Sequence, residues 1–499
     1  MREHRSQPRS MGVAVGVLAL LLATGLAGAG AATDASTART AAAAPPARSA
    51  QLHTGFHNPV VPQSTGGADS PDPWMFRHGG RYWLTYTSGD HIEVRSSRAL
   101  GGLGDARAVR LWPPAGAAEP AERCCEIWAP EIHRLTGPDG PRWYVYYTAK
   151  AADEGFVHRL YVLESEGDNP AGPYHFAGRL DVPQTFAIDA TVTTVGAQTY
   201  VLYSGGPSFS PTSLYLAPLS DPWTVAATPI AISSPTLPWE MVVAPINEGP
   251  EVLQHDGQLH VIYSASWCGT GAYALGRLTV PLTADLTDPL TWAAAKSPLP
   301  VFSAAPQRDV YGPGHGSFFT SPDGTEDWMV YHATDTSQGC FTGGVRTTRV
   351  QRFTWSSDGT PDFGRPVALD TDLEAPSGDR TLTVQAEDAV AAGRVVDDRR
   401  LFGYQGVAVR PAARRPLPAF DLGLARAGRH RIVLRVLGGP DAGRVTVVGP
   451  GGRHVTRSAV RPQEEVVVLR FGRMRLRGGD HPLHFHVSRP LTLDQLRLR

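Results

Sequence analysis

The sequence has little cysteine, no strong net charge and no apolar run long enough to span a bilayer. Its 499 residues carry a formal net charge of −1, which gives no sign of a polyanionic partner such as a nucleic acid. Hydrophobic residues make up 42% and charged residues 19%, a balance typical of a globular protein and not of a disordered chain. The length exceeds what one ordinary core supports, so two domains are expected.

The four cysteines are Cys124, Cys125, Cys268 and Cys340. No CxxC pair or His/Cys cluster suggests a zinc site. The cysteines fit an oxidising compartment and permit disulfides. The sequence does not determine their pairing, and we expect that the adjacent Cys124 and Cys125 do not bond to each other.

The N-terminus has the features of a secretion signal. Three arginines among the first nine residues precede an apolar run at 13–26, and small residues follow. A spanning helix needs about 20 apolar residues, so a signal peptide over 1–32 is favoured over a membrane anchor. The Ala-, Thr- and Pro-rich residues 33–50 are expected to form a disordered linker. We therefore expect a secreted, extracellular protein with no membrane partner.

One β unit recurs five times along residues 51–370. An acidic residue or histidine leads each copy, a glycine-containing turn follows, and an aliphatic or aromatic strand ends in Tyr. Successive lead residues are 59, 58, 59 and 67 positions apart. This period predicts a five-bladed β-propeller whose first strands line the axis, so that the lead residues converge on one pocket. The lead residues are Asp72, Glu131, Asp189, Glu248 and His315.

The composition changes after a polar linker at 371–380. Residues 371–499 contain 22 arginines, no lysine and 13 acidic residues. Short strands separated by turns predict a β-sandwich over 381–499. The arginine excess fits either polyanion binding or a solvated surface, and both interpretations stay open. The predicted fold class is all-β, a five-bladed β-propeller followed by a β-sandwich domain.

Three of the lead residues are a carboxylate set suited to glycosidic hydrolysis. That reaction needs an acid to protonate the leaving oxygen and a base to activate water. Partial burial and a nearby carboxylate raise the pKa of the acid, and a separation of about 6.5–9.5 Å gives inversion. Singly, Asp72, Asp189 and Glu248 could each serve a turn or a cap. Their common place in the repeat favours catalysis.

The remaining lead residues and their aromatic neighbours have two interpretations each. His315 is either a buried, hydrogen-bonded side chain or a ligand of an ion or water at the axis, and Glu131 is expected to orient substrate or support the structure. Nearby aromatic residues could stack on a sugar ring, although core packing is the default for each. These aromatic residues are Trp74, Trp128, Phe186 and Trp239.

Residues 55–370 resemble glycoside hydrolase family 43, the five-bladed arabinosidases and xylosidases. The matching stretches, in order, are Asn58-Pro-Val with Pro71-Asp72-Pro73-Trp74, Ile127-Trp-Ala-Pro-Glu-Ile-His133, Ile188-Asp-Ala-Thr191, Asn247-Glu-Gly-Pro250 and Tyr311-Gly-Pro-Gly-His315. The resemblance implies inversion without a cofactor, with Asp72 as general base, Glu248 as general acid, and Asp189 tuning and orienting the acid. The signal around the base is split between Ala68-Asp69 and Pro71-Asp72-Pro73. We choose Asp72 because Pro73-Trp74 and the following strand align with it, and Asp69 is the alternative.

Two further stretches, Ser234-Pro-Thr-Leu-Pro-Trp-Glu240 and Gly314-His-Gly-Ser-Phe-Phe319, are most similar to the secreted exo-acting α-L-arabinofuranosidase branch. The implied substrate is arabinan or arabinoxylan of the plant cell wall, cleaved by a monomer. A β-xylosidase or endo-arabinanase of the same family is an alternative. A retaining fructan-type enzyme and a non-catalytic sugar-binding propeller are alternatives of other kinds.

The C-terminal part resembles carbohydrate-binding modules of the β-sandwich type. The likeness is carried by Val384-Gln-Ala-Glu-Asp388, Gly403-Tyr-Gln-Gly406 and Leu491-Thr-Leu-Asp-Gln-Leu496. It implies a structural calcium site near Glu387 and Asp494, with oxygen ligands. A plain accessory sandwich is the alternative.

Overall fold

The computed structural model describes residues 55–62, 69–390, 393–411, 419–424, 427–438, 443–449, 454–459 and 465–499. The predicted signal peptide at 1–32 and linker at 33–50 lie outside the described residues. In the described part, no helix has both the length and the apolar character that crossing a membrane requires. Strands dominate and the helices are single turns, so the predicted all-β fold is confirmed.

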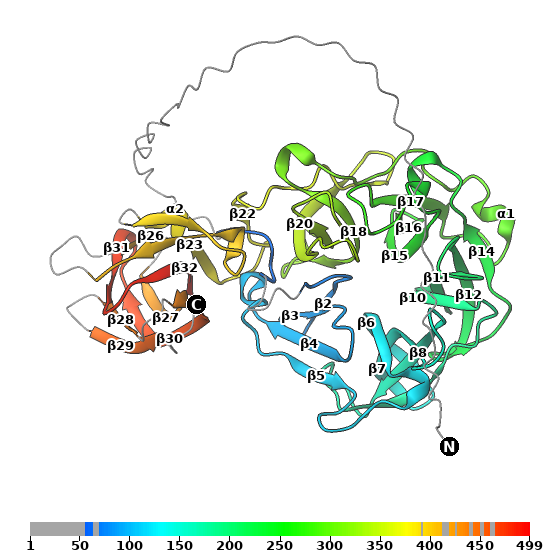
Figure 1. Ribbon diagram of the computed structural model, residues 1–499, viewed down its shortest axis with the longest axis horizontal. Helices are drawn as coiled ribbons and strands as arrows, with labels where there is room; N and C mark the ends of the chain where they lie inside the picture. Colours follow the sequence, from blue (N-terminus) through cyan, green and yellow to red (C-terminus); the bar gives the residue numbers. More distant parts are fainter. Residues whose placement is uncertain are drawn as a thin grey trace, which may run out of the picture. The chain divides into compact units, whose positions relative to one another are not determined.

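Five antiparallel sheets follow one another around a common axis, and their first strands β2, β6, β10, β15 and β18 lie innermost (Figure 1). Blade I comprises β2 (Trp74–His78), β3 (Arg81–Thr85), β4 (Ile92–Ser97) and β5 (Val109–Trp112). Blade II comprises β6 (Cys125–Gly137), β7 (Gly140–Lys150), β8 (His158–Ser165) and β9 (Tyr174–Arg179). Blade III comprises β10 (Phe186–Val195), β11 (Gln198–Gly206), β12 (Ser213–Asp221), β13 (Thr224–Val225) and β14 (Ile230–Ser233). Blade IV comprises β15 (Asn247–His255), β16 (Gln258–Ala265) and β17 (Ala274–Pro281). Blade V comprises β18 (Tyr311–Thr320), β19 (Asp327–Thr334), β20 (Thr347–Trp355) and β21 (Pro361–Asp362).

Helical turns occupy some of the connections between strands. They are η1 (Leu100–Gly102), η2 (Ala121–Arg123), η3 (Pro238–Met241), α1 (Pro289–Trp292), η4 (Pro306–Arg308), α2 (Ala386–Ala389) and η5 (Phe402–Tyr404).

Five hydrophobic clusters fill the gaps between neighbouring blades. Each cluster takes buried side chains from two adjacent blades, which explains why no blade is stable without its neighbours. In ring order, the clusters include Val94 with Ile132, Leu160 with Val201, Leu214 with Val261, Leu275 with Met329, and Val330 with Leu84.

A ring of hydrogen bonds also links the blades. The side chain that follows each strand-ending Tyr bonds to the backbone of the next blade, near its lead residue. Four of these side chains accept a hydrogen bond from a backbone N–H: Thr87 Oγ1 from Ala129 (2.7 Å), Thr148 Oγ1 from Asp189 (3.1 Å), Ser264 Oγ from His315 (2.8 Å) and His332 Nδ1 from Asp72 (3.1 Å). The fifth, Ser204 Oγ, donates to Asn247 O at 2.7 Å. The last bond joins blade V to blade I and closes the ring.

The segment before blade I adds a second closure. The amide of Asn58 donates to Val350 O and accepts from Val350 N, each at 2.9 Å, and Val60 N donates to Thr348 O at 3.0 Å. This segment therefore pairs with β20 of blade V. Just before it, β1 (Gly55–Phe56) pairs with β22 (Leu373–Glu374) beyond the propeller.

Two sheets form the C-terminal sandwich. One has the order β24–β25–β32–β27–β30 with β23 beside β32, and the other has the order β26–β31–β28–β29. Phe420, Leu434 and Phe485 belong to the buried cluster of this domain. The strands are β23 (Leu382–Gln385), β24 (Arg394–Asp397), β25 (Gln405–Val409), β26 (Ala419–Leu424), β27 (Gly428–Gly438), β28 (Gly443–Val448), β29 (His454–Ala459), β30 (Val466–Leu476), β31 (Gly479–Val487) and β32 (Leu491–Leu498).

The cysteine pairing corrects one expectation. Cys124 and Cys125 are bonded to each other, with Cα atoms 3.7 Å apart, and Cys268 pairs with Cys340. The Cα separation is below the usual range for disulfides, about 4.4–6.8 Å, because the two residues are adjacent in the chain. Cys124 follows η2 directly, and Cys125 is the first residue of β6.

Candidate active site

The inner strands leave regular β geometry at their lead residues. The register of β10 with β11 shifts between Ile188 and Thr191, and that of β15 with β16 shifts between Glu248 and Glu251. Asp72, Asp189 and His315 have φ values of 55°, 58° and 34°, which non-glycine residues seldom adopt. A bulge takes a residue out of the ladder and redirects its side chain. Four lead residues, Asp72, Asp189, Glu248 and His315, thereby come together in one buried cluster.

Asp72 is held as a carboxylate. Thr87 Oγ1 donates to its Oδ2 at 2.7 Å, while His315 Nδ1 and Arg346 Nη1 lie 3.3 Å and 3.4 Å from its Oδ1. Burial alone would raise the pKa of Asp72. The positive charges of Arg346 and His315 prevail and hold that pKa well below its usual range. Asp72 is therefore ionised and ready to accept a proton.

Glu248 has the opposite character. Burial, followed by the negative charge of Asp189, raises the pKa of Glu248 to about 7. Its Oε1 accepts a hydrogen bond of 2.7 Å from the Tyr273 hydroxyl, which favours the ionised form and limits the rise. Glu248 therefore holds a proton in mildly acidic solution and can donate it.

Asp189 interacts electrostatically with both of the other carboxyl groups. Its Oδ2 accepts a hydrogen bond of 3.1 Å from Gly249 N, directly after Glu248, and lies 4.0 Å from His315 Nδ1. Burial is the main cause that raises the pKa of Asp189, to about 6. Gly249 has φ 52°, and a Cβ at this position would lie 2.8 Å from the ring of His315. The close packing of this ring therefore requires glycine.

His315 is a buried cation in this cluster. Burial alone would lower the pKa of His315, but the carboxylates of Asp189 and Asp72 raise it to about 10. The contacts of His315 with Asp72 and Asp189 agree with the interpretation of this residue as a buried, hydrogen-bonded side chain. The ion at the axis stays a prediction.

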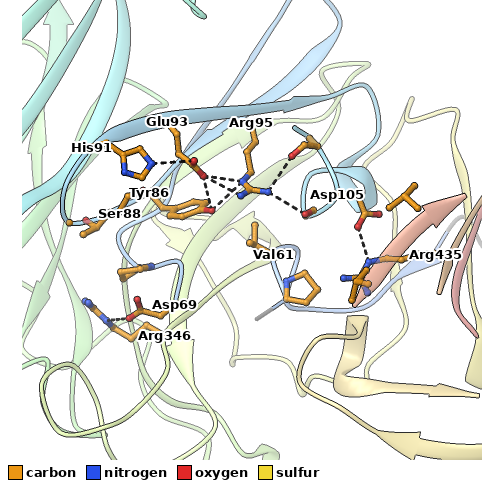
Figure 2. A pocket seen from close by; sticks show the side chains of 18 of the residues that line it. Val61, Asp69, Tyr86, Ser88, His91, Glu93, Arg95, Asp105, Arg346 and Arg435 are labelled. Carbon is orange, nitrogen blue, oxygen red and sulfur yellow. Dashed lines mark hydrogen bonds and ion pairs between the residues drawn. The ribbon is translucent and has the colours of Figure 1, made fainter. Parts of the chain in front are cut away.

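Asp69, the alternative base, lies outside the cluster. Its Oδ2 is 3.6 Å from Arg346 Nε at the edge of a pocket of about 740 Å³ (Figure 2). Its side chain is 40% exposed, against 11% for Asp72. Arg346 therefore pairs with both aspartates, but only Asp72 also contacts His315.

Glu131 forms a separate acidic pair with Glu251, which the sequence reasoning missed. Glu131 Oε2 lies 2.7 Å from His133 Nε2. Burial and the charge of Glu131, to which Glu251 is hydrogen-bonded, raise the pKa of Glu251 well above its usual range. Because two buried carboxyl groups side by side do not both ionise, Glu251 retains its proton and is neutral.

The four predicted stacking residues pack against other residues of the propeller. Trp74 Nε1 donates to Ile132 O at 3.1 Å and its ring lies 4.4 Å from that of His133, so Trp74 packs between blades I and II. Trp128 stacks on His158 at 4.1 Å, and the buried Phe186 meets the same ring edge-on at 5.4 Å. Trp239 stacks near Tyr263, away from the cluster, and its indole donates to Pro298 O.

Sequence reasoning missed Thr87, Tyr273, His332 and Arg346. Thr87 and His332 had a signal, because each directly follows the Tyr that ends the second strand of its blade. Tyr273 and Arg346 lie in loops at less regular positions, and no periodic pattern marks them.

The expected calcium ligands have other partners. Asp494 accepts hydrogen bonds from Phe402 N and from the guanidinium of Arg435, which also lies 2.7 Å from Asp105 Oδ1. Glu387 Oε1 lies 3.2 Å from His57 Nδ1. With a buried arginine on Asp494 in place of a metal, these residues do not fit a calcium ion. His57 and Asp388 do belong to a looser group, with Asp372, whose ligand atoms lie within 4.8 Å of one another.

Comparison with known proteins agrees with this geometry. Residues 56–361 match the family model described as glycosyl hydrolases family 43. An extracellular exo-α-(1→5)-L-arabinofuranosidase of Streptomyces avermitilis is 37% identical over 323 residues, which cover 63% of this chain and 64% of that protein. An enzyme of the same name from Streptomyces chartreusis is 35% identical over 56% of this chain and 82% of its own length.

A solved structure is similar as well. The crystal structure of an α-L-arabinofuranosidase from Lactobacillus brevis superposes with a TM-score of 0.57 at 32% identity, covering 63% of this chain and 98% of that one. The chain spans slightly less than two thirds of the Streptomyces avermitilis relative. The family match covers all five blades and every residue of the buried carboxyl cluster, and the chain therefore belongs to the glycosyl hydrolases family 43.

Proposed function

We propose that the protein is a secreted, inverting, exo-acting α-L-arabinofuranosidase that acts on arabinan or arabinoxylan side chains. The observation that carries the proposal is the contrast between two buried carboxyl groups in one cluster. Glu248 has a pKa of about 7, whereas the pKa of Asp72 is held well below its usual range. Environments that push two carboxyl pKa values apart assign the acid and the base.

In the proposed reaction, Glu248 gives its proton to the glycosidic oxygen as the bond to the anomeric carbon breaks. Asp72 accepts a proton from a water molecule, which attacks the anomeric carbon from the opposite face. Asp189 keeps Glu248 protonated through its charge and fixes the backbone after Glu248 through the Gly249 N–H. The cationic His315 holds Asp72 and Asp189 in place.

The sugar specificity and the secretion are supported by the relatives. The proteins from Streptomyces avermitilis and Streptomyces chartreusis are both named extracellular exo-α-(1→5)-L-arabinofuranosidases. The three arginines and the apolar run at the N-terminus, which have the features of a signal peptide, agree with secretion. A non-catalytic sugar-binding propeller has no use for the complete carboxyl set. A retaining fructan-type enzyme would need an Asn-Asp-Pro-Asn-Gly start, which this sequence lacks.

For the C-terminal sandwich we propose an accessory carbohydrate-binding role within a monomeric enzyme. The likeness to carbohydrate-binding modules over 381–499 supports it. Retention of the isolated full-length protein on insoluble arabinoxylan, compared with a chain ending at residue 370, would test this role.

An activity screen tests the main proposal. Purified protein is offered linear arabinan, arabinoxylan and 4-nitrophenyl β-xyloside, and the released sugars are identified by chromatography. Release of single arabinose units, abolished in Glu248→Gln with the fold retained by circular dichroism, is expected. Release of xylose or of arabino-oligosaccharides would instead favour a β-xylosidase or an endo-arabinanase.

A further inference from the structure

A cleft of about 550 Å³ opens beside the carboxyl cluster, and its walls are mainly aromatic. Phe156, Phe209, Trp267 and Phe341 line it, one from each of blades II to V. Each lies in the loop that joins the second strand of its blade to the third. Because neighbouring strands are antiparallel, these loops lie at the end of the blade where the inner strand begins. The cleft is therefore on the face that carries the lead residues.

Ring contacts connect the cleft to the inner strands β10 and β6. Phe186 lines the cleft and lies three positions before Asp189 on β10. Its ring lies 6.3 Å from that of Phe209, which lies 6.0 Å from that of Phe156. On the other side, Phe186 and Trp128 both contact His158. An unbroken aromatic path thus runs from Trp128, in the Trp-Ala-Pro-Glu turn, into the cleft.

The cleft lies on the side of the proposed acid. Trp267 N donates to Val242 O at 3.4 Å, so the loop after β16 packs on the segment that leads to Glu248. Val243 in this segment is 72% exposed. The general acid protonates the leaving oxygen, and the part of the substrate that departs must lie next to it. The cleft therefore borders the leaving-group side.

Two features of the cleft, the side chain of Phe341 and the indole N–H of Trp267, serve no evident purpose in folding. Phe341 is 71% exposed and has φ 59°, a conformation that is unfavourable for a bulky residue. The disulfide between Cys268 and Cys340 fixes the loops that carry Trp267 and Phe341 to each other. Trp267 Nε1 is a buried donor without a hydrogen-bond partner among the described residues. Exposed, fixed aromatic rings and an unsatisfied donor are typical of a binding site.

The chemistry of the walls selects the ligand. Apart from the indole N–H, only Thr185 and Ser208 offer side-chain hydrogen-bonding groups. A bare sugar in this cleft would leave most of its hydroxyl groups without partners, at a cost in free energy. A flat aromatic ring needs few hydrogen bonds and gains from stacked and edge-on contacts with Phe and Trp. A volume of about 550 Å³ accommodates such a group.

We propose that this cleft binds a planar aromatic group carried on the leaving-group side of the substrate. The inference rests on the proposed glycosidase function. Two sources share this chemistry, an aryl aglycone and a hydroxycinnamoyl ester on the sugar next to the cleaved bond.

The test compares matched substrates in wild type, Phe156→Ala and Phe341→Ala. One pair is an arabino-oligosaccharide with and without a hydroxycinnamoyl ester on its second sugar, and the other is 4-nitrophenyl and methyl α-L-arabinofuranoside. Each Phe variant is expected to raise KM about 2- to 10-fold for the aromatic member only, as loss of one aromatic contact implies. Leu290→Ala, which removes an equally exposed side chain on α1, should leave both ratios unchanged.

The affected pair identifies the source, ester or aryl aglycone. Direct titration with methyl hydroxycinnamate separates this inference from the proposed function, because binding does not require turnover. Saturable binding that weakens in both Phe variants supports the cleft even if every glycoside is inert, a result that would refute the proposed function alone. Equal KM ratios in all variants, or binding that the Phe variants do not weaken, would overturn the inference.

Discussion

The hydroxyl of Tyr273 donates a 2.7 Å hydrogen bond to Glu248 Oε1. This hydrogen bond and the positive charge of His315 oppose the rise in the pKa of the proposed acid, because both favour the carboxylate. Burial, followed by the charge of Asp189, raises that pKa, and the balance sets how far into neutral pH the acid stays protonated.

This balance predicts the pH dependence of activity. Glu248 must be protonated and Asp72 ionised, so kcat/KM should be high in mildly acidic solution and fall as the pH rises through about 7. Tyr273→Phe removes a bond that stabilises the ionised form, so the pKa of Glu248 rises and the alkaline limb moves to higher pH. Profiles of kcat/KM for both proteins measure the shift. An alkaline limb that stays in place or moves to lower pH in the variant would contradict this assignment.

The choice of base is tested by two matched substitutions. Asp72→Asn should lower kcat by about 10²- to 10⁴-fold, because it removes the group that accepts the proton of water. Asp69→Asn removes a neighbouring partner of the same Arg346 and should keep most of the activity. Steady-state kinetics on one aryl arabinofuranoside compare the two. The reverse order of effects would make Asp69 the base.

The two disulfides should contribute unequally to stability. Cys268 and Cys340 are separated by 72 positions, so replacing both with Ser should lower the free energy of unfolding by about 4 kcal/mol. Cys124 and Cys125 are adjacent, and their bond restricts almost no loop in the unfolded chain. Urea denaturation of the two double variants measures the difference. Equal losses would show that loop closure is not the source of the stabilisation.

Arg435 should be essential to the sandwich. It is buried against Asp494 and Asp105, and Asp105 also lies 2.6 Å from Arg497 Nη2. Arg435→Met should cost about 3–5 kcal/mol of folding free energy, because it leaves the buried carboxylate of Asp494 without its charged partner. The exposed Arg444→Met on β28 is the control.

Added EDTA should leave the wild-type Tm unchanged, and a large drop would restore calcium as the cation beside Asp494.

The sequence predicted the ring because its period is long and regular. The lead residues and the Tyr residues that follow them mark blade after blade. Four of the five lead residues, Asp72, Asp189, Glu248 and His315, meet in one cluster as expected, whereas Glu131 pairs with Glu251. The residue after each Tyr carries the same period in a less obvious form. Thr87, Thr148, Ser204, Ser264 and His332 differ in type but share the role of bonding to the next blade.

Other features depend on contacts that no local pattern encodes. Arg346 reaches Asp72 across 274 positions, and the Tyr273 hydroxyl reaches Glu248 from the loop between β16 and β17. The bond between Cys124 and Cys125 joins two adjacent residues, a pairing that sequence reasoning had set aside. The arginine beside Asp494 comes from a different strand, β27, so a likeness limited to the terminal strand could suggest a metal there and miss the cation that the chain itself supplies.

The central claim is that Asp72 and Glu248 act from opposite faces of the bond, as base and acid. Proton NMR of the first-formed product tests it most directly. The account predicts that an α-L-arabinofuranoside releases β-L-arabinofuranose first, with the α-anomer appearing only by later mutarotation. Release of the α-anomer first would mean retention through a covalent intermediate and would contradict the account.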